Sequence, residues 1–375
     1  MTQSAHFSLI FILSTTICAC THNTEGGFVL EPHVGTHAMG YLSTTYVPPE
    51  SSTAYPISIW YPATVTPNAA LAHYSLAGNA QASISARAYS NVPVAPGTFP
   101  IILFSHGSPS TRIQSWFLLE ALASHGYVVA AIEHTDNIVS SLCSSGAIPA
   151  ITTSDRAGEL VTLYAAILAN ADVKDHVLSD NVSLLGHSRG GATALTLAIQ
   201  NTVLKQKLKS VAIMDGGDNG DDTPDYTSVK IPTLFLTAST TSFRQWVAEA
   251  GENINSGVCM QAVYPGADHQ SFSNACGMLA GIPETGLTLD CNGTSTTIPK
   301  ENIQYAYGAE ITCSNPSQET VHRATAQLLT SFFSSYLMND MVITLDTWKT
   351  ASNTAKLPWQ LFDCQHINGD QTALP

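Results

Sequence analysis

The pentapeptide Gly186-His187-Ser188-Arg189-Gly190 has a spacing that could make its serine a nucleophile. The G-x-S-x-G pattern does so where a strand runs into a helix, because the sharp turn exposes the hydroxyl. An apolar run at 181–187 predicts that strand, and the sequence from residue 190 predicts the helix. Glycines let neighbouring backbone pass close to the serine, and the helix N-terminus favours developing negative charge. The sequence therefore predicts a nucleophilic Ser188; the alternative is a glycine-rich turn without chemistry.

A nucleophilic serine needs a base and an acid that orients the base. Where a nucleophilic serine lies at such a strand–helix turn, the acid and then the histidine follow it in the sequence. Three histidines follow Ser188, namely His269, His322 and His366. The first ends the apolar run at 260–269 and precedes the last helical segment, which is the expected place. We therefore predict His269 as the general base.

The acid is expected where a later strand ends. The apolar run at 231–239 is followed by no carboxylate, whereas the preceding run ends at Asp215. We therefore predict Asp215 as the acid, with Asp218 as its nearest rival. An acidic run follows, and it could suggest Ca²⁺, but a solvated acidic loop is the preferred interpretation and no metal is expected. The run consists of Asp215, Asp218, Asp221, Asp222 and Asp225.

A tetrahedral oxyanion needs two backbone N–H donors. One is predicted at Arg189, directly after the serine, and the other at Ser108, in the loop "LFSHGSPS". His106 precedes the nucleophile and is interpreted as a residue that shapes this loop. The stretch "EHTD" at 133–136 could pass for an acid–base pair. It also precedes the nucleophile, so its residues Glu133, His134 and Asp136 are interpreted as organising a loop or a pocket edge.

Apolar runs that read as buried strands alternate with helical segments from residue 99 onward. This alternation predicts a mostly parallel, doubly wound α/β sheet flanked by helices. The segment 34–63 is expected to form an antiparallel edge. The stretches 271–319 and 338–375 are predicted to be long ordered loops held by disulfides. The expected strands are 54–63, 99–107, 127–134, 181–188, 208–216, 231–239 and 260–269, and the expected helices are 113–126, 155–171, 190–200 and 320–337.

Composition restricts the class of protein further. With 44% hydrophobic and only 11% charged residues, the chain can bury a large core. Its net charge of −14 argues against a nucleic-acid partner, because phosphates require clustered Lys and Arg. The first 20 residues carry no charged side chain and include a short apolar core, which predicts a signal peptide.

The cysteine residues also indicate an exported protein. "Ile17-Cys18-Ala19-Cys20" resembles a lipoprotein cleavage site, so Cys20 could be lipidated and attach the protein to a membrane; the alternative is an ordinary secretory signal. We expect a periplasmic or cell-surface lipoprotein, or otherwise a secreted protein. Six cysteines remain beyond Cys20, an even number that suggests disulfides in an exported chain, with a connectivity that the sequence leaves open.

Several motifs together resemble the platelet-activating-factor acetylhydrolase-like family of α/β-hydrolases, which is related to dienelactone hydrolases and cutinase-like polyesterases. The resemblance covers about residues 54–337 and rests on "FSHGSPS", "ALASHGYVVAAIEHTDN", "GHSRGGATAL", "AIMDGG" and "ADHQSFS", in that order. It implies an α/β-hydrolase fold and a triad of Ser188, Asp215 and His269. It also implies oxyanion donors at Ser108 and Arg189.

The resemblance implies cleavage of carboxylic esters, with short or oxidised acyl groups on phospholipids among the expected substrates and no cofactor. The catalytic domain would span 21–337, with a cysteine-containing insertion at about 271–319 and an extension at 338–375. Both depart from the family pattern, so acetyl specificity is not carried over. Residues 140–154 and 276–313 are expected to shape the pocket rim. Open alternatives are an amidase or peptidase, a polyester hydrolase, and a non-catalytic binding protein; the oligomeric state is not predicted.

Overall fold

The structure is a computed structural model that describes residues 28, 30–76, 83–144, 149–200, 202–217, 224–306, 317–338 and 343–364. The predicted signal peptide, Cys20, Asp218 and His366 lie outside these residues. Within them, no helix is long and apolar enough to cross a bilayer.

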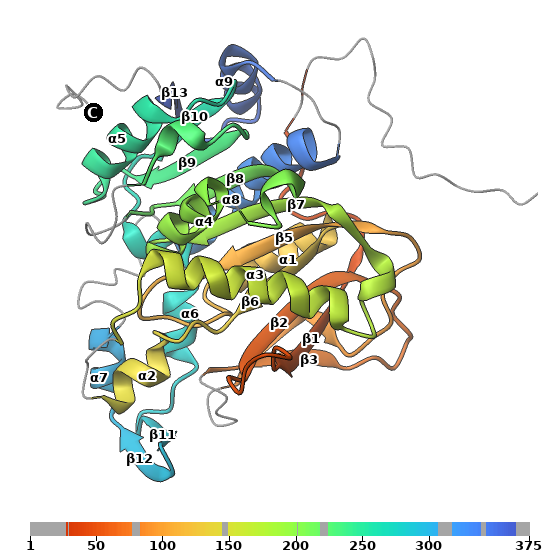
Figure 1. Ribbon diagram of the computed structural model, residues 1–375, viewed down its shortest axis with the longest axis vertical. Helices are drawn as coiled ribbons and strands as arrows, with labels where there is room; N and C mark the ends of the chain where they lie inside the picture. The colour runs from red at the N-terminus through yellow and green to blue at the C-terminus, as the bar shows by residue number, and fades with distance from the viewer. Residues whose placement is uncertain are drawn as a thin grey trace, which may run out of the picture.

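Eleven strands of the described residues form one sheet, in the order β13-β10-β9-β8-β7-β5-β6-β2-β1-β4-β3 (Figure 1). The central strands from β6 to β10 are parallel to one another, and β2 and β13 flank them in antiparallel orientation. The strands are β1 (Ala38–Tyr46), β2 (Tyr55–Ala63), β3 (Leu71–Ser75), β4 (Ser83–Ser90), β5 (Phe99–Ser105), β6 (Val128–Ile132), β7 (Val177–His187), β8 (Leu208–Met214), β9 (Thr233–Ala238), β10 (Cys259–Tyr264) and β13 (Gln360–Asp363).

Helices cover both faces of this sheet (Figure 1). Helices α1 and α8 pack on one face, and α3, α4 and α5 pack on the other. The helices are α1 (Trp116–Ser124), α2 (Ile138–Cys143), α3 (Thr153–Ala169), α4 (Arg189–Ile199), α5 (Arg244–Asn253), α6 (Ala275–Ala280), α7 (Lys300–Ala306), α8 (Gln318–Phe333) and α9 (Leu345–Thr354). The predicted doubly wound arrangement is therefore confirmed. Strands β1 and β2, from the segment 34–63, pair antiparallel as expected, but β4 and β3 lie outside them, so the edge strand on this side is β3.

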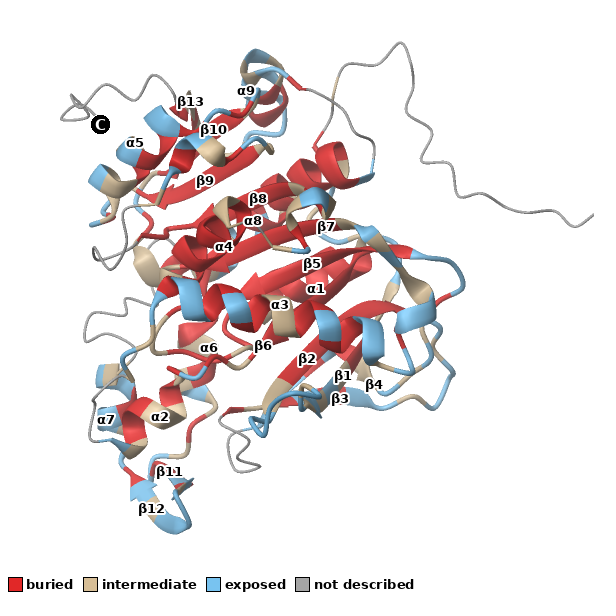
Figure 2. Cartoon of the chain, in the orientation of Figure 1, coloured by how far each residue is buried: buried red, intermediate tan, exposed pale blue. Residues whose placement is uncertain are grey.

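The central strands bury both of their faces, as their continuous apolar runs predict. In β5 every residue is buried (Figure 2), and alternate residues belong to opposite cores. Ile102 and Phe104 belong to the core under α1 and α8, whereas Ile101 and Leu103 belong to the core under α3 and α4. The period of two in a strand produces this division.

The prediction that 271–319 and 338–375 are loops is wrong. The first stretch contains α6, α7 and a hairpin of β11 (Leu287–Cys291) and β12 (Thr294–Ile298). The hairpin turn is Asn292-Gly293, and both residues have positive φ angles, 55° and 81°. Asn-Gly between alternating residues is a strong hairpin signal, and it was available in the sequence. The second stretch contains α9 and β13, and β13 pairs with β10 in the main sheet.

Two disulfides join segments far apart in the chain. Cys143–Cys291 links α2 to the hairpin, and Cys259–Cys364 links β10 to the chain just after β13. Cys276 is also disulfide-bonded. Because disulfides persist in oxidising compartments, these bridges indicate an exported or extracytoplasmic protein.

Candidate active site

Ser188 lies at the turn between β7 and α4 and has a φ angle of 57°. A positive φ is costly for a residue with a side chain and persists only where the surroundings enforce it. The glycines provide that enforcement by allowing close packing. A Cβ at Gly186 would lie 2.0 Å from the Gly190 carbonyl oxygen, and one at Gly190 would lie 2.1 Å from the Ser105 carbonyl oxygen. The G-x-S-x-G glycines are therefore needed for this turn to form.

Asp215 and His269 are brought together at the neighbouring strand ends. Asp215 directly follows β8, is fully buried and has its Oδ2 2.7 Å from Nδ1 of His269. Its Oδ1 accepts a 2.8 Å hydrogen bond from the backbone N–H of Ala238, at the end of β9. The strand that lacks a carboxylate thus supplies a donor that holds the carboxylate of its neighbour. His269 begins the short helix η5 (His269–Phe272) after β10, and its side chain is 33% exposed.

Ser188 lies one strand from this pair. Strands β7 and β8 are parallel neighbours, with His187 in register with Met214, so Ser188 and Asp215 follow at adjacent ends. The Ser188 N–H donates to the Met214 carbonyl at 3.0 Å. A Cβ at Gly216 would lie only 2.9 Å from the Ser188 carbonyl oxygen. Sheet topology therefore gathers the three predicted residues at one edge.

The loop after β5 passes directly beside Ser188. A Cβ at Gly107 would lie 3.2 Å from the Ser188 Cβ. The Gly107 carbonyl accepts a 2.7 Å hydrogen bond from Nδ1 of His106. In a trans peptide the C=O and N–H point in opposite directions, so this bond also sets the direction of the Ser108 N–H. His106 is buried, and burial is the main reason that its pKa falls to about 3. It therefore holds the loop as a neutral imidazole.

The residues of "EHTD" support this loop from below. The His134 N–H donates to Nε2 of His106 at 3.0 Å, and the His134 ring lies between Ser105 Oγ (2.8 Å) and Glu159 (2.6 Å). Burial lowers the pKa of His134 well below its ordinary value and raises that of Glu159. All of these groups are at least nine-tenths buried. Their contacts are those of residues that organise a loop.

Asp136 forms a second buried contact beneath the same loop. Its two oxygens accept from Nη1 of Arg156 at 2.7 and 2.8 Å, and both side chains are fully buried. Burial by itself would raise the pKa of Asp136, but the Arg156 guanidinium, together with Ser108 and two neighbouring histidines, favours the carboxylate, so the pKa is lowered. Nη2 of Arg156 donates to the His106 carbonyl oxygen. The ion pair therefore fixes the backbone at the start of the loop after β5, residues 106–112, which is called the oxyanion loop below after its predicted donor Ser108.

Arg189 places its backbone and its side chain in different environments. Its backbone begins α4 directly after Ser188, where the predicted oxyanion donor belongs. Its guanidinium donates to the Ile151 carbonyl oxygen and lies 3.8 Å from Asp136. The side chain therefore tethers the segment before α3 to the elbow, a role that the sequence left open.

Gln114 is a polar residue beside the site that no sequence motif predicted. Gln114 is buried, accepts from the Gly107 N–H at 2.7 Å and contacts the His187 ring at 3.0 Å. No motif includes it, because its contacts depend on how the loop folds back. His322, one of the three candidate bases, lies elsewhere: its ring stacks on Phe117 at a centroid distance of 3.6 Å.

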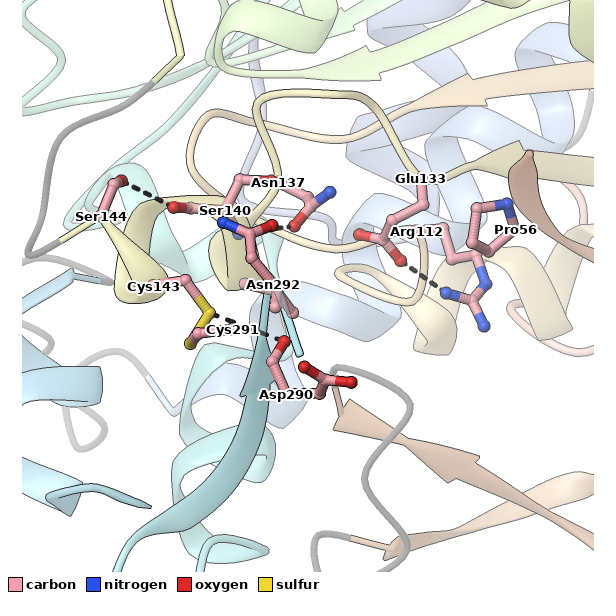
Figure 3. A pocket seen from close by; sticks show the side chains of 11 residues that line it. Pro56, Arg112, Glu133, Asn137, Ser140, Cys143, Ser144, Asp290, Cys291 and Asn292 are labelled. Carbon is pink, nitrogen blue, oxygen red and sulfur yellow. Dashed lines mark hydrogen bonds and ion pairs between the residues drawn. A yellow bond between two sulfur atoms is a disulfide. The ribbon is translucent and has the colours of Figure 1, made fainter. Parts of the chain in front are cut away.

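A cavity of about 460 Å³ lies between Arg112, helix α2 and the hairpin of β11 and β12 (Figure 3). The Arg112–Glu133 ion pair, 2.5 Å long, lines it on one side, and the Cys143–Cys291 disulfide lines it on the other. The two segments predicted to shape a pocket rim both contribute to this one cavity. Its lining includes none of the predicted catalytic residues.

Metal ligands were not expected at this site. Over the residues that the structure describes, no group of three or more His, Cys, Asp or Glu side chains could hold a metal ion. Most of the acidic run after Asp215 lies outside those residues.

The parallel sheet, the strand–helix elbow and the acid and histidine at later strand ends define the class of α/β-hydrolases. The solved ferulic acid esterase from Streptomyces cinnamoneus shares this fold, with a TM-score of 0.60, 19% identity, and coverage of 82% of this chain and 92% of that one. The predicted fold is therefore confirmed. The chlorophyllase family matches residues 75–352, so this chain belongs to that family.

Individual chlorophyllases match a shorter stretch. Chlorophyllase-1 of Arabidopsis thaliana is 31% identical over 111 residues, and chlorophyllase-1 of Citrus sinensis is 28% identical over 108 residues. Each alignment covers less than a third of this chain and 31% of the plant protein. The specific likeness to acetylhydrolases stays a prediction.

Proposed function

We propose that this protein is a serine hydrolase that cleaves carboxylic esters through an acyl-enzyme on Ser188. The observation that carries the proposal is the 2.7 Å contact between Asp215 Oδ2 and His269 Nδ1, at the strand end next to the Ser188 elbow. With Nδ1 donating to the carboxylate, Nε2 is the ring nitrogen left to accept the serine proton. Membership of the chlorophyllase family and the esterase-like fold support ester cleavage.

In the first step, His269 Nε2 takes the Ser188 proton while Oγ bonds to the ester carbonyl carbon. The carbonyl oxygen becomes an oxyanion that accepts from the Ser108 and Arg189 N–H groups. Asp215 stabilises the imidazolium that forms. The bond between the carbonyl carbon and the alcohol oxygen then breaks, and His269 returns the proton to the leaving alcohol.

In the second step, His269 removes a proton from water, whose oxygen attacks the acyl-enzyme. A second oxyanion forms in the same place, the bond to Ser188 Oγ breaks, and the proton returns to Oγ. The products are a carboxylic acid and the free enzyme. Every proton transfer uses a residue of this chain.

The proposed substrates are short-acyl esters, including acyl groups of phospholipids, as the likeness to acetylhydrolases implies. We further propose that the protein is exported and attached to a membrane through a lipidated Cys20. Such attachment would place a lipid-ester hydrolase at its substrate.

The test is a chain-length series of p-nitrophenyl esters and a short-acyl phospholipid, measured with the wild type and with Ser188→Ala. Loss of Ser188 should lower turnover by roughly 10⁶-fold. Ser188→Ala with near-wild-type turnover would overturn the nucleophile assignment, and a wild type that cleaves amides but no ester in the series would overturn the reaction class.

A further inference from the structure

Three hydrogen bonds join three segments of the proposed site. These are the oxyanion loop, the turn between β7 and α4 at Ser188 (the nucleophile elbow) and the segment after β10 that carries His269 (the histidine loop). The Gly107 N–H donates to Gln114 Oε1 at 2.7 Å. Gln114 Nε2 lies 3.0 Å from His187 Nδ1, and His187 Nε2 lies 2.9 Å from the His269 carbonyl oxygen. The residues at the ends of this chain each belong to a different loop of the proposed site.

The backbone groups of Gly107 and His269, at the two ends of this series of hydrogen bonds, determine which group donates in each bond. A backbone N–H can only donate, so the Gln114 oxygen faces Gly107 and its NH₂ group faces His187. A backbone carbonyl can only accept, so His187 carries its proton on Nε2 and presents a lone pair on Nδ1. This assignment satisfies both side chains with neither left unpaired. A neutral His187 is required.

The surroundings keep His187 neutral. Its side chain is fully buried, and burial, followed by the nearby His269, lowers its pKa to about 3. The His187 and His269 rings are in tilted contact, with centroids 4.7 Å apart and planes inclined by 30°. An uncharged neighbour matters there, because the proposed mechanism gives His269 a positive charge in each step.

We infer that Gln114 and His187 are positioning residues that set the spacing between the oxyanion loop and the general base. Gln114 fixes the Gly107 N–H while His106 fixes the Gly107 carbonyl, so both peptide groups of this glycine are held. His187 holds the main chain of His269 and precedes Ser188 in sequence. This inference rests on the proposed serine mechanism, in which sub-ångström placement controls turnover.

The direct test replaces the amide by a titrating group. In Gln114→Glu one oxygen still accepts from Gly107, but the other meets the His187 Nδ1 lone pair. If the new carboxyl and His187 together hold one extra proton, all three hydrogen bonds form again. Without that proton, either the bond between the carboxylate and His187 or the bond between His187 and the His269 carbonyl is lost. The ratio of kcat/KM for Gln114→Glu to that of the wild type should therefore be highest at acidic pH. It should fall at least about tenfold as the pH rises through the pKa of the new pair.

Gln114→Met removes both hydrogen bonds at nearly constant size, and its kcat should fall on the order of 10- to 100-fold at every pH. The matched control is Gln261→Met. Gln261 is a buried glutamine of β10 whose Nε2 donates to Thr237 Oγ1 of β9 at 3.1 Å. Its kcat should match that of the wild type. Thermal unfolding of each variant verifies that it is folded.

The outcomes separate the two claims. A Gln114→Glu profile parallel to the wild type overturns the positioning role while leaving the serine mechanism intact. If Gln114→Met does not fold, the Gln114→Glu ratio alone decides. A wild type whose Ser188 is not labelled by a fluorophosphonate overturns the mechanism and this inference with it.

Discussion

Asp215 and His269 are separated by 54 residues in the chain, yet Oδ2 and Nδ1 lie 2.7 Å apart. The parallel order of β8, β9 and β10 produces this contact, because all three strands end at the same edge. The carboxylate reaches across β9 and is anchored there by the Ala238 N–H. An acid on the earlier strand can therefore orient the histidine.

Asp215→Asn should lower kcat by about 10³- to 10⁴-fold, because an amide facing Nδ1 favours the wrong imidazole tautomer. Steady-state kinetics on a p-nitrophenyl ester measure the loss, and circular dichroism verifies the fold. Asp218→Asn replaces the rival acid and should retain wild-type turnover. Equal losses in both variants, or none in Asp215→Asn, would contradict the assignment.

Gly190→Ala should destabilise the fold by at least about 2 kcal/mol and abolish the elbow, because the new Cβ meets the Ser105 carbonyl at 2.1 Å. The matched control is Gly158→Ala in α3, where a Cβ meets nothing within 4 Å. That change should stabilise the helix by up to about 1 kcal/mol. Urea unfolding of both variants gives the comparison, and equal midpoints would show that the glycine is dispensable.

Stability should fall as the pH drops from about 6.5 toward 3. The pKa of His106 and of His187 is lowered to about 3, mainly by burial. For each histidine, between its folded-state pKa of about 3 and its unfolded-state pKa of about 6.5, the unfolded chain binds a proton that the folded chain does not. Acid therefore favours unfolding in this range. Each histidine contributes a slope of about 1.4 kcal/mol per pH unit in this window.

Urea unfolding at pH 7 and pH 5 tests this dependence. His187→Gln can accept and donate in place of the imidazole but does not titrate, so it should reduce the slope. His73→Gln alters an exposed imidazole and serves as the control. An unchanged slope in His187→Gln would contradict the origin proposed here.

Removing the Cys259–Cys364 bridge by a Cys259→Ser/Cys364→Ser double variant should cost about 3 to 5 kcal/mol. The bridge closes a segment of 105 residues and holds β13 at the edge of the sheet. The free energy of unfolding, from urea titration, should fall in the variant, and it should fall further in the reduced wild type, where the Cys143–Cys291 bridge is open as well. Equal stability of oxidised and reduced protein would exclude this contribution.

The sequence predicts best what periodicity controls. Central strands such as β5, β8 and β9 are buried on both faces, so their apolar runs were readable, and the strand–helix order located Ser188. Strands β3 and β4 were not predicted, because each buries only some of its residues. The edge strand β13 has four residues, too few for a pattern, and its pairing with β10 is a long-range contact.

The predicted site residues lie where strand order places them, since parallel strands bring their carboxyl ends together. The side-chain contacts that hold these residues in place could not be predicted from the sequence. Gln114, Arg156 and Glu159 become part of the site only through folding back of the loop after β5 and packing of α3 beneath it. Such contacts depend on side-chain geometry, which leaves no mark on residue spacing.

Labelling with a fluorophosphonate, followed by peptide mass spectrometry, tests the central claim most directly. The proposed mechanism predicts one phosphonyl group per protein, on Ser188, with ester hydrolysis lost in proportion to labelling. Ser188→Ala should take up no label. A label on another residue that removes the activity, or full activity in a protein labelled at Ser188, would contradict the assignment of Ser188 as the nucleophile.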